Sequence, residues 1–324
     1  MAFGEFDLID TYFTHRWPKR DDVVKGVGDD AAILTLPSDS ELIIATDTMV
    51  SGVHFDEQMP ARAVGHKVAA VNLSDLAAMG AEPAWLSLAL TLPEMDQEWL
   101  EGFSHGLREI CDYYDCHLIG GDTTKGPLTL TVTAHGFVPQ GTALRRDGAK
   151  PGDWIYVSGS IGDAGLALAA QQRKVQISDS HYRRVLERLY FPSPRVALGQ
   201  ALRDIASSAI DISDGLKADL GHILQASNVG ARVDVDELPL SLALTESVTA
   251  EDAIRYALHS GDDYELCFTV PESRRGVFDT VLARHPAKPT CIGRITSEAN
   301  KLRLERNEEP WQGADEKGGY DHFG

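Results

Sequence analysis

Residues 68–81 read VAAVNLSDLAAMGA, and Asp75 is the only charged residue in this run. Apolar residues recur at helical spacing through residues 61–79, which predicts a buried helix. Burying an ionised carboxylate without a partner is costly, so Asp75 needs a strong one. No Lys or Arg lies within one helical turn of Asp75 inside the run. The pattern leaves two explanations open: a basic partner from elsewhere in the fold, or a divalent cation.

Strand and helix patterns alternate on both sides of this helix. In the first half of the chain we predict strands at residues 41–46, 84–92, 116–119 and 128–138, and a further helix at residues 96–114. This alternation is typical of a domain that packs helices against a sheet.

Residues 145–153, RRDGAKPGD, combine charge, Gly and Pro, which is typical of a domain boundary. Beyond this segment the alternation restarts. We predict helices at residues 164–172, 180–189, 195–207 and 216–227, and strands at residues 154–158, 209–212, 231–235 and 265–270. The fold class is therefore predicted as α+β, a two-domain α/β protein divided into residues 1–150 and 151–324.

Charge and composition exclude several classes of function. The 324 residues carry a net charge of −19, which argues against binding to nucleic acid or to anionic membranes. The chain has no apolar run long enough to span a membrane and no signal-peptide pattern at its start. Its four cysteines show no CxxC spacing, so we expect reduced thiols and a cytoplasmic location.

Two glycine-rich segments resemble nucleotide-binding motifs only weakly. Residues 26–31, GVGDDA, match a degenerate dinucleotide fingerprint, but two carboxylates stand where a pyrophosphate would lie. Residues 159–165, GSIGDAG, follow a predicted strand and open a predicted helix. They would form either a phosphate cradle or an ordinary turn with Asp163 in the first helical turn. A P-loop is excluded, because GxxxxGK[ST] does not occur.

Six short aspartate motifs are distributed along the chain, several of them at predicted strand ends. They are GDDA at residues 28–31, TDT at 46–48, LSDL at 73–76, GGDT at 120–123, DISDG at 211–215 and GDDY at 261–264. Any one alone would be a turn or a helix cap. Together they suggest several Mg²⁺ ions that clamp a polyphosphate, because oxygen ligands without a Cys/His set select hard cations. Structural Ca²⁺ is the alternative, although no DxDxDG loop is present.

Few basic groups are available for phosphate. Arg145 and Arg146 would form a cationic clamp, or would be two surface arginines at a hinge. His54 follows the TDT motif and would contact a phosphate or be a loop histidine with an internal partner. Aromatic residues in the tail, Tyr320 among them, would stack on a planar ring if the tail folds back.

The ordered set GDDAA, TDTMVSGVHF, NLSDLAAMGA, GGDTT, DISDGL and SGDDYEL resembles bacterial thiamine-monophosphate kinases, in the superfamily of aminoimidazole-ribonucleotide synthetase. The resemblance covers essentially the whole chain. It implies a PurM-like fold whose N-terminal α/β domains share a sheet in a homodimer. It also implies ATP-dependent phosphorylation of thiamine monophosphate to thiamine diphosphate.

The resemblance also implies site residues, carried over motif by motif. The Mg²⁺ ligands would be Asp30, Ala45 through its carbonyl, Thr46, Asp47, Asp75, Asp122, Asp211 and Asp214. ATP would contact His105, Gly121, Asp122, Arg146 and Ser213, and the thiamine substrate would contact His54, Asp262 and Tyr320. Two of these depart from the family pattern: His105 replaces a frequent tyrosine, and Asp262 replaces a common glutamate. Tyr320 occupies the tail position where an aromatic residue, often tryptophan, would pack on the thiamine.

The acceptor oxygen of thiamine monophosphate is already ionised at neutral pH, so direct in-line attack on ATP needs no general base. We therefore expect no catalytic side chain beyond those that bind metal and position substrates. Two other functions remain open: another ATP-dependent synthetase of the superfamily, and a non-catalytic, metal-stabilised carrier of thiamine phosphates. The first 110 residues contain no Cys, which argues against a selenophosphate synthetase.

Overall fold

The computed structural model describes residues 4–14, 17 and 20–313. Contacts divide the chain into two compact units. The first comprises residues 1–76 and 81–141, and the second comprises residues 77–80 and 142–324.

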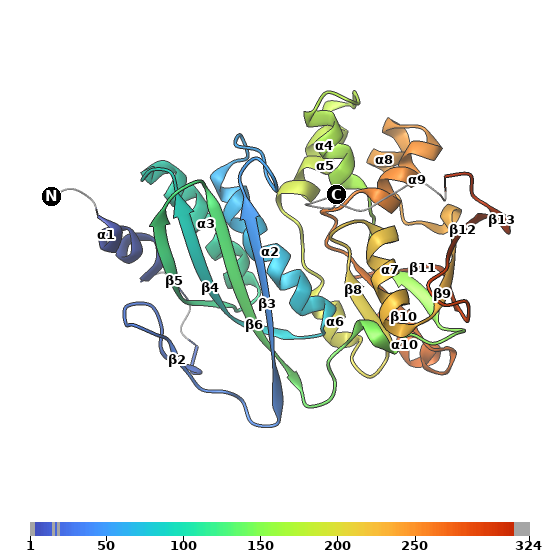
Figure 1. Cartoon of the computed structure of the whole chain (residues 1–324), viewed down its shortest axis with the longest axis horizontal. Helices are drawn as coiled ribbons and strands as arrows, with labels where there is room; N and C mark the ends of the chain where they lie inside the picture. Colours follow the sequence, from blue (N-terminus) through green and yellow to red (C-terminus); the bar gives the residue numbers. More distant parts are fainter. Residues whose placement is uncertain (1–3, 15–16, 18–19, 314–324) are drawn as a thin grey trace. The chain divides into compact units, whose positions relative to one another are not determined.

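A four-stranded sheet with helices on one face forms the first unit (Figure 1). The strands are ordered β3-β6-β4-β5, in which only β4 and β5 run parallel. The elements are α1 (Glu5–Ile9), β1 (Val23–Lys25), β2 (Ile33–Leu34), β3 (Ser40–Val50), α2 (Ala61–Ala78), β4 (Glu82–Leu92), α3 (Gln97–Tyr113), β5 (His117–Lys125) and β6 (Thr129–Pro139). Because β3 and β5 are the two edges, residues on these strands are separated by the full width of the sheet.

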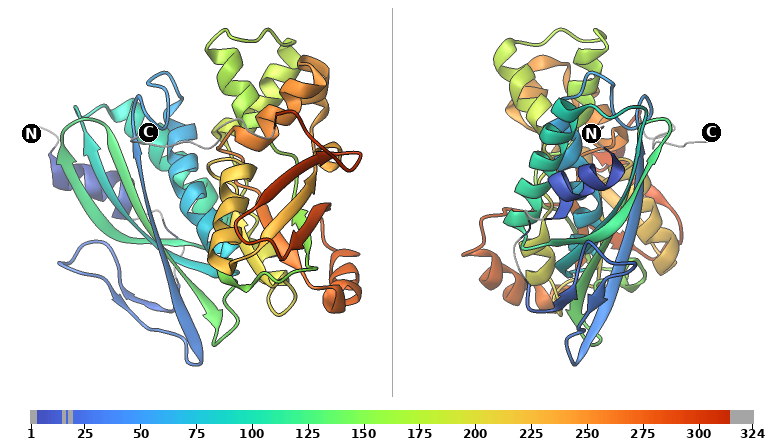
Figure 2. Two further views of the ribbon diagram at one scale, coloured as in Figure 1. Left: turned by 45° about the vertical axis from the view of Figure 1, so that its right-hand side comes forward. Right: turned by 90° about the vertical axis from the view of Figure 1, so that its left-hand side faces the viewer.

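The two faces of this sheet differ in chemistry. Along β6, Leu130, Val132 and Ala134 are buried, whereas the intervening Thr131 and Thr133 are partly exposed. This alternation with a period of two places the apolar residues of β6 on a more deeply covered face than its threonines. Both views in Figure 2 place α2 and α3 on one face of the sheet. The threonines of β3 and β6 pair with each other on the other face, which we call the open face.

Glycines allow α2 and α3 to pack closely against each other. A Cβ on Gly65 would lie 2.0 Å from the carbonyl oxygen of Phe103, and one on Gly106 would lie 1.9 Å from that of Arg62. Any larger residue at these two positions would push the helices apart. The position of α2 over the sheet, and with it that of Asp75, therefore depends on these glycines.

The second unit contains a mixed seven-stranded sheet, ordered β13-β12-β9-β11-β7-β10-β8. Its helices are α4 (Asp163–Gln171), α5 (Asp179–Tyr190), α6 (Val196–Ala201), α7 (Leu216–Ser227), α8 (Leu242–Ser247), α9 (Ala250–His259) and α10 (Arg275–Leu282). Its strands are β7 (Trp154–Val157), β8 (Ser208–Asp211), β9 (Gly230–Asp234), β10 (Leu266–Val270), β11 (Thr290–Thr296), β12 (Leu302–Arg306) and β13 (Glu309–Pro310). The apolar core of this unit lies between α7 and the sheet, with Ile210, Leu220 and Ile223 each at most 1% exposed.

The predicted fold class is confirmed, and two local predictions were wrong. The helix predicted at residues 195–207 ends at Ala201, because a turn follows before β8. Asp47 and Asp122 do not follow strands but lie inside β3 and β5, which are longer than their apolar segments. Hydrogen bonds to neighbouring strands extend both elements through polar residues that the hydrophobic pattern left out.

None of the described helices combines the length and apolar character needed to cross a membrane.

Candidate functional site

Asn72 joins the Asp47 backbone to α2, the helix that carries Asp75. The Asp47 backbone amide donates a hydrogen bond of 3.1 Å to Oδ1 of Asn72, and Nδ2 of Asn72 donates to the Val68 carbonyl at 3.0 Å. Asn72 is fully buried. Asp75 lies three residues further along α2, on the same helical face, and is partly exposed amid buried neighbours. The structure thus brings the β3 and α2 aspartates to one side of the sheet.

Asp122 lies elsewhere in this unit. Residues paired across neighbouring strands point to the same face of a sheet. The pairing runs from Asp122 through Ala89 and Thr131 to Thr48, which lies on the open face, so Asp122 projects from that face too. Asp47 is adjacent to Thr48 in β3 and projects from the helix-covered face. Three strand spacings separate the two strands, about 14 Å in all. One chain therefore does not bring Asp122 together with Asp47.

Gly121 precedes Asp122 at a position that no other residue could occupy without moving the strand. A Cβ there would lie 1.8 Å from the carbonyl oxygen of Leu88 on the neighbouring strand. The glycine allows β5 to approach β4 closely at this point. Asp122, the next residue of β5, is exposed.

The other predicted ligands of the first unit occupy different surroundings. Asp30 is exposed in the loop after β1. The Asp47 amide points away from β6, toward Asn72. Residues two apart in a strand direct their backbone groups to the same edge, so the Ala45 carbonyl also points away from β6. The Thr46 hydroxyl bonds to that of Thr133 at 3.0 Å on the open face. The side chains of Thr46 and Asp47 therefore project from opposite faces of the sheet.

In the second unit, the loop at residues 211–215 connects β8 to α7. The Asp214 amide donates to Oδ2 of Asp219 in the first turns of α7, at 3.1 Å. Asp219 is 2% exposed. Burial, with the charge of nearby Asp211, raises the pKa of Asp219 to about 8. Asp211 and Asp219 are therefore two buried acids that repel each other when both are ionised.

A second loop, residues 261–265, is bonded to the first. The Asp262 amide donates to the Ser213 carbonyl at 2.9 Å, and the Tyr264 amide donates to that of Ile212 at 2.8 Å. Gly261 faces Ser213 so closely that a Cβ would lie 2.2 Å from the Ser213 carbonyl oxygen. Ser213, a predicted ATP contact, and Asp262, a predicted substrate contact, are thus held side by side.

Glu265, at the end of the second loop, is buried in a cationic network. Its carboxylate accepts hydrogen bonds from Arg188 at 2.7 Å, from Ser158 at 2.5 Å and from both nitrogens of the Arg195 fork, one of them at 2.7 Å. Burial alone would raise the pKa of Glu265, but the bonds and charges of the two arginines outweigh it and lower that pKa. Glu265 thus anchors the loop as an ionised carboxylate.

The glycine-rich segment at residues 159–165 is an ordinary turn in this structure. The Gly162 amide, at the start of α4, donates to both carboxylate oxygens of Asp263, at 2.8 and 3.0 Å. A protein carboxylate therefore occupies the position that a phosphate would need. Of the two interpretations of this segment, the contacts favour the turn.

The remaining predicted contacts are dispersed. Nδ1 of His54 accepts the Val50 amide at 3.0 Å. Nε2 of His105, on the exposed side of α3, lies 3.4 Å from Glu109. Arg145 pairs with Asp147 at 2.5 Å, while the exposed Arg146 has no ion-pair partner among residues 4–14, 17 and 20–313. Tyr320 lies outside the described residues.

The oxygen atoms of the predicted ligand residues suit hard cations that bind few protein groups. Within the described part of the chain, no three His, Cys, Asp or Glu side chains gather into a ready metal site. Mg²⁺ commonly takes only one or two carboxylates and completes its shell with water and phosphate oxygens. The partly exposed Asp75 in a buried helix, on the same side of the sheet as Asp47, matches that requirement.

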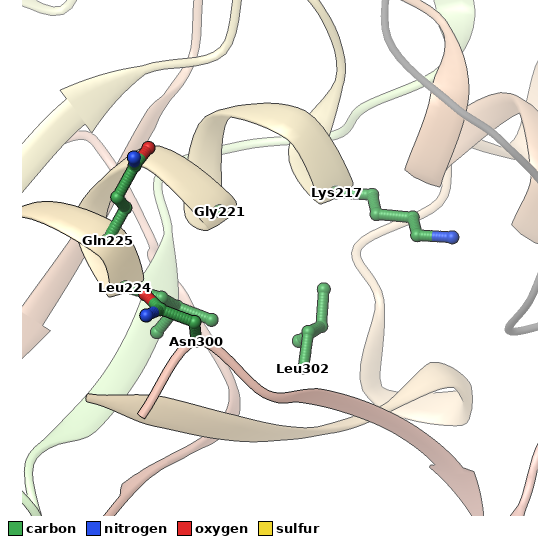
Figure 3. Close-up of a pocket in the computed structure, with 6 residues that line it drawn as sticks. All are labelled: Lys217, Gly221, Leu224, Gln225, Asn300 and Leu302. Atoms are coloured by element: carbon green, nitrogen blue, oxygen red, sulfur yellow. The ribbon is translucent and has the colours of Figure 1, made fainter. Parts of the chain in front are cut away.

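A shallow pocket of about 390 Å³ lies elsewhere in the second unit, between α7 and the segment leading into β12 (Figure 3). Its lining residues are Lys217, Gly221, Leu224, Gln225, Asn300 and Leu302. None of them is a predicted site residue. The hollow in Figure 3 is thus not where the predicted aspartates lie.

Three residues of functional interest escaped the sequence-based prediction: Asn72, Asp219 and Tyr264. Asn72 lies three residues before Asp75, and its buried amide in an apolar helix was a usable signal. Asp219 follows the DISDG motif by one helical turn, and Tyr264 belongs to the SGDDYEL motif itself. Their partners are backbone amides and a neighbouring side chain, which only the fold reveals.

Comparison with known families matches both halves of the chain. Residues 28–138 match the N-terminal domain of AIR synthase related proteins, and residues 150–304 match the C-terminal domain. Among curated proteins, the thiamine-monophosphate kinase of Salmonella typhimurium is 52% identical over 330 residues, covering 100% of this chain and 99% of the relative. That of Escherichia coli K12 is also 52% identical, over 328 residues, with the same coverage.

Solved structures agree with the sequence relatives. The thiamine-monophosphate kinase of Stenotrophomonas maltophilia K279a is 47% identical with a TM-score of 0.84, covering 90% of this chain and 93% of that one. A structure described as AaThiL complexed with AMPPCP and TMP is 30% identical with a TM-score of 0.77, covering 99% of this chain and 97% of that one. The hydrogenase maturation protein HypE in complex with ATP, 21% identical with a TM-score of 0.75, shares the fold.

Proposed function

The chain belongs to the thiamine-monophosphate kinase family and phosphorylates thiamine monophosphate at the expense of ATP, and we propose that it does so by direct in-line transfer. Identity of 52% over the whole chain carries the assignment. A phosphate oxygen of the acceptor attacks the γ-phosphorus of ATP, the bond to the β-phosphate oxygen breaks, and ADP leaves. The nucleophile is ionised at neutral pH, so no side chain has to remove a proton.

Aspartates of both units would hold Mg²⁺ in this proposal. Their ligand set is Asp30, the Ala45 carbonyl, Thr46, Asp47, Asp75, Asp122, Asp211 and Asp214. When bound, Mg²⁺ neutralises charge on the phosphates, which otherwise repel each other. The exposure of Asp75 within an otherwise buried helix is the observation that best supports metal binding.

The polar and cationic residues would position the two substrates. Gly121, Asp122, Arg146, Ser213 and His105 are proposed for ATP. Arg146 is exposed and unpaired within the described ranges, so it would be available to a phosphate without first breaking an ion pair. His54, Asp262 and Tyr320 are proposed for thiamine monophosphate.

We further propose that the enzyme is a homodimer in which Asp122 acts in the site of the other copy. Asp47 and Asp122 project from opposite faces of one sheet, on opposite edges, so they would share phosphates only if a second chain supplied one of them. Leu42 is 40% exposed and Ile44 57% exposed on β3, and they border the threonine-lined open face. This apolar edge would be covered by the second copy.

A cytoplasmic location is proposed from the cysteines. Cys111, Cys116 and Cys267 are buried free thiols, and Cys291 is a half-buried one. Four unpaired cysteines suit a reducing compartment.

Release of ADP tests the proposed function. ADP should form only when thiamine monophosphate and Mg²⁺ are both present, with thiamine diphosphate as the product. Incubation with γ-labelled ATP alone should leave the protein unlabelled, and a labelled phosphoprotein would contradict direct transfer. ADP formed equally well with a different acceptor would redirect the assignment to another reaction of the superfamily.

A further inference from the structure

The Tyr264 hydroxyl donates a hydrogen bond of 2.9 Å to Oδ1 of Asp262, two residues earlier. Tyr264 is only 9% exposed, whereas Asp262 is partly exposed. A buried, rigid phenol thus holds one oxygen of a carboxylate that reaches the surface. The bond restrains the rotation of that carboxylate.

Both residues of this pair have a strained, left-handed backbone conformation. Asp262 has φ of +65° and Tyr264 has φ of +50°, in the left-handed region that non-glycine residues rarely adopt. Strain of this kind persists only where the surrounding structure enforces it, and it clusters at functional sites. Here the two amides bonded to Ser213 and Ile212 enforce it.

The residues between and after the pair are anchored inward. Asp263 binds the Gly162 amide, and Glu265 binds Arg188 and Arg195. Because these neighbours face the interior, Asp262 is the one acidic side chain of the loop that remains partly exposed. The loop therefore presents a single oriented carboxylate next to Ser213.

We propose that Tyr264 is a positioning residue for the acceptor substrate: its hydroxyl orients the Asp262 carboxylate toward thiamine monophosphate. This inference rests on the proposed role of Asp262 in substrate binding. Thiamine carries a cationic ring, which a fixed carboxylate would attract more strongly than a freely rotating one. Tyr264 touches neither substrate in this proposal, and its effect passes entirely through Asp262.

A double-mutant cycle separates this role from a purely structural one. Tyr264→Phe removes only the hydroxyl and should raise KM for thiamine monophosphate roughly tenfold, as expected for a lost hydrogen bond to a charged group. KM for ATP should change less than about twofold. In an Asp262→Ala background, adding Tyr264→Phe should have no further effect on either constant.

Tyr190→Phe is the matched control. Its hydroxyl accepts a hydrogen bond of 2.7 Å from Gln171 in the same unit, so the variant also loses one tyrosine hydroxyl and its bond, but at a residue outside the loop. It should leave KM for thiamine monophosphate unchanged. Calorimetric binding of thiamine monophosphate to each folded variant gives an independent readout.

Three outcomes would overturn the inference. They are a parallel rise in KM for both substrates, equal effects of Tyr264→Phe with and without Asp262, and a Tyr264→Phe protein that does not fold. If Asp262→Ala itself left KM for thiamine monophosphate unchanged, the proposed role of Asp262 would fall first. The kinase assignment would survive any of these results, because it depends on product formation by the unmodified protein.

Discussion

Asp47 and Asp122 project from opposite faces of one four-stranded sheet and lie on its two edge strands. Each carboxylate is held by regular β structure, so neither reaches the other by a side-chain rotation. Two metal ligands that both contact one polyphosphate need to be much closer than the roughly 14 Å of three strand spacings. A shared site built from two copies resolves this conflict.

Mixing inactive variants tests the shared site. Asp47→Asn and Asp122→Asn should each abolish turnover alone. After subunit exchange, a mixed dimer contains one site with both aspartates intact, so an equal mixture should recover about a quarter of the wild-type activity. No recovery, with mixed dimers verified by mass spectrometry, would mean that each chain uses its own two aspartates.

Replacing Asp75 should separate metal binding from folding. Asp75→Asn keeps the shape but loses the charge, so turnover should fall by about a thousandfold or more, the range expected when a positioned metal clamp is lost. Because Asp75 is partly exposed, the melting temperature without Mg²⁺ should stay close to that of the wild type. Asp112→Asn, an exposed carboxylate on α3, is the control. If the Asp75 variant lost activity because it was unfolded at the assay temperature, Asp75 would be a structural ligand.

Asn72 should control how β3 and α2 are spaced. Asn72→Leu leaves the Asp47 amide without its acceptor in a partly buried position and removes the buried Asn72 amide, which should destabilise the fold by about 1–3 kcal/mol. The Mg²⁺ concentration for half-maximal activity should also rise, because Asp47 and Asp75 lose their common support. Ser104→Ala, which removes a buried hydroxyl bonded within α3, is the matched control and should leave the Mg²⁺ requirement unchanged. Normal Mg²⁺ dependence in the Asn72→Leu variant would show that Asn72 serves stability alone.

Glu265 should contribute a pH-dependent share of stability. Its pKa is lowered in the folded state below the ordinary 4.5, so its stabilising effect is present above that value and is lost as pH falls through the folded pKa. Glu265→Gln removes the negative charge that Arg188 and Arg195 bind. It should lower the free energy of unfolding by about 3 kcal/mol or more at pH 7. Urea unfolding at pH 7 and at pH 4 measures both effects. The exposed Glu272→Gln variant should change the free energy of unfolding far less, and an equal loss in the two variants would contradict the role of the buried network.

The sequence by itself determined the fold class, most of the elements and the chemical character of the site. Apolar runs at strand and helix spacing require burial, which is why α2, β4, α3 and α7 were predictable to within a few residues. The single charge in residues 68–81 marked Asp75, because a carboxylate in an apolar helix needs a partner that offsets the cost of its burial.

Only the tertiary structure decided which aspartates lie on the same side of the sheet. Asp47 is bonded to Asn72 of α2, and Asp122 lies across the sheet, because strand order and the alternation of side chains depend on pairings between residues far apart in the chain. The same holds for Tyr264, whose position against Asp262 depends on two left-handed residues held by a neighbouring loop.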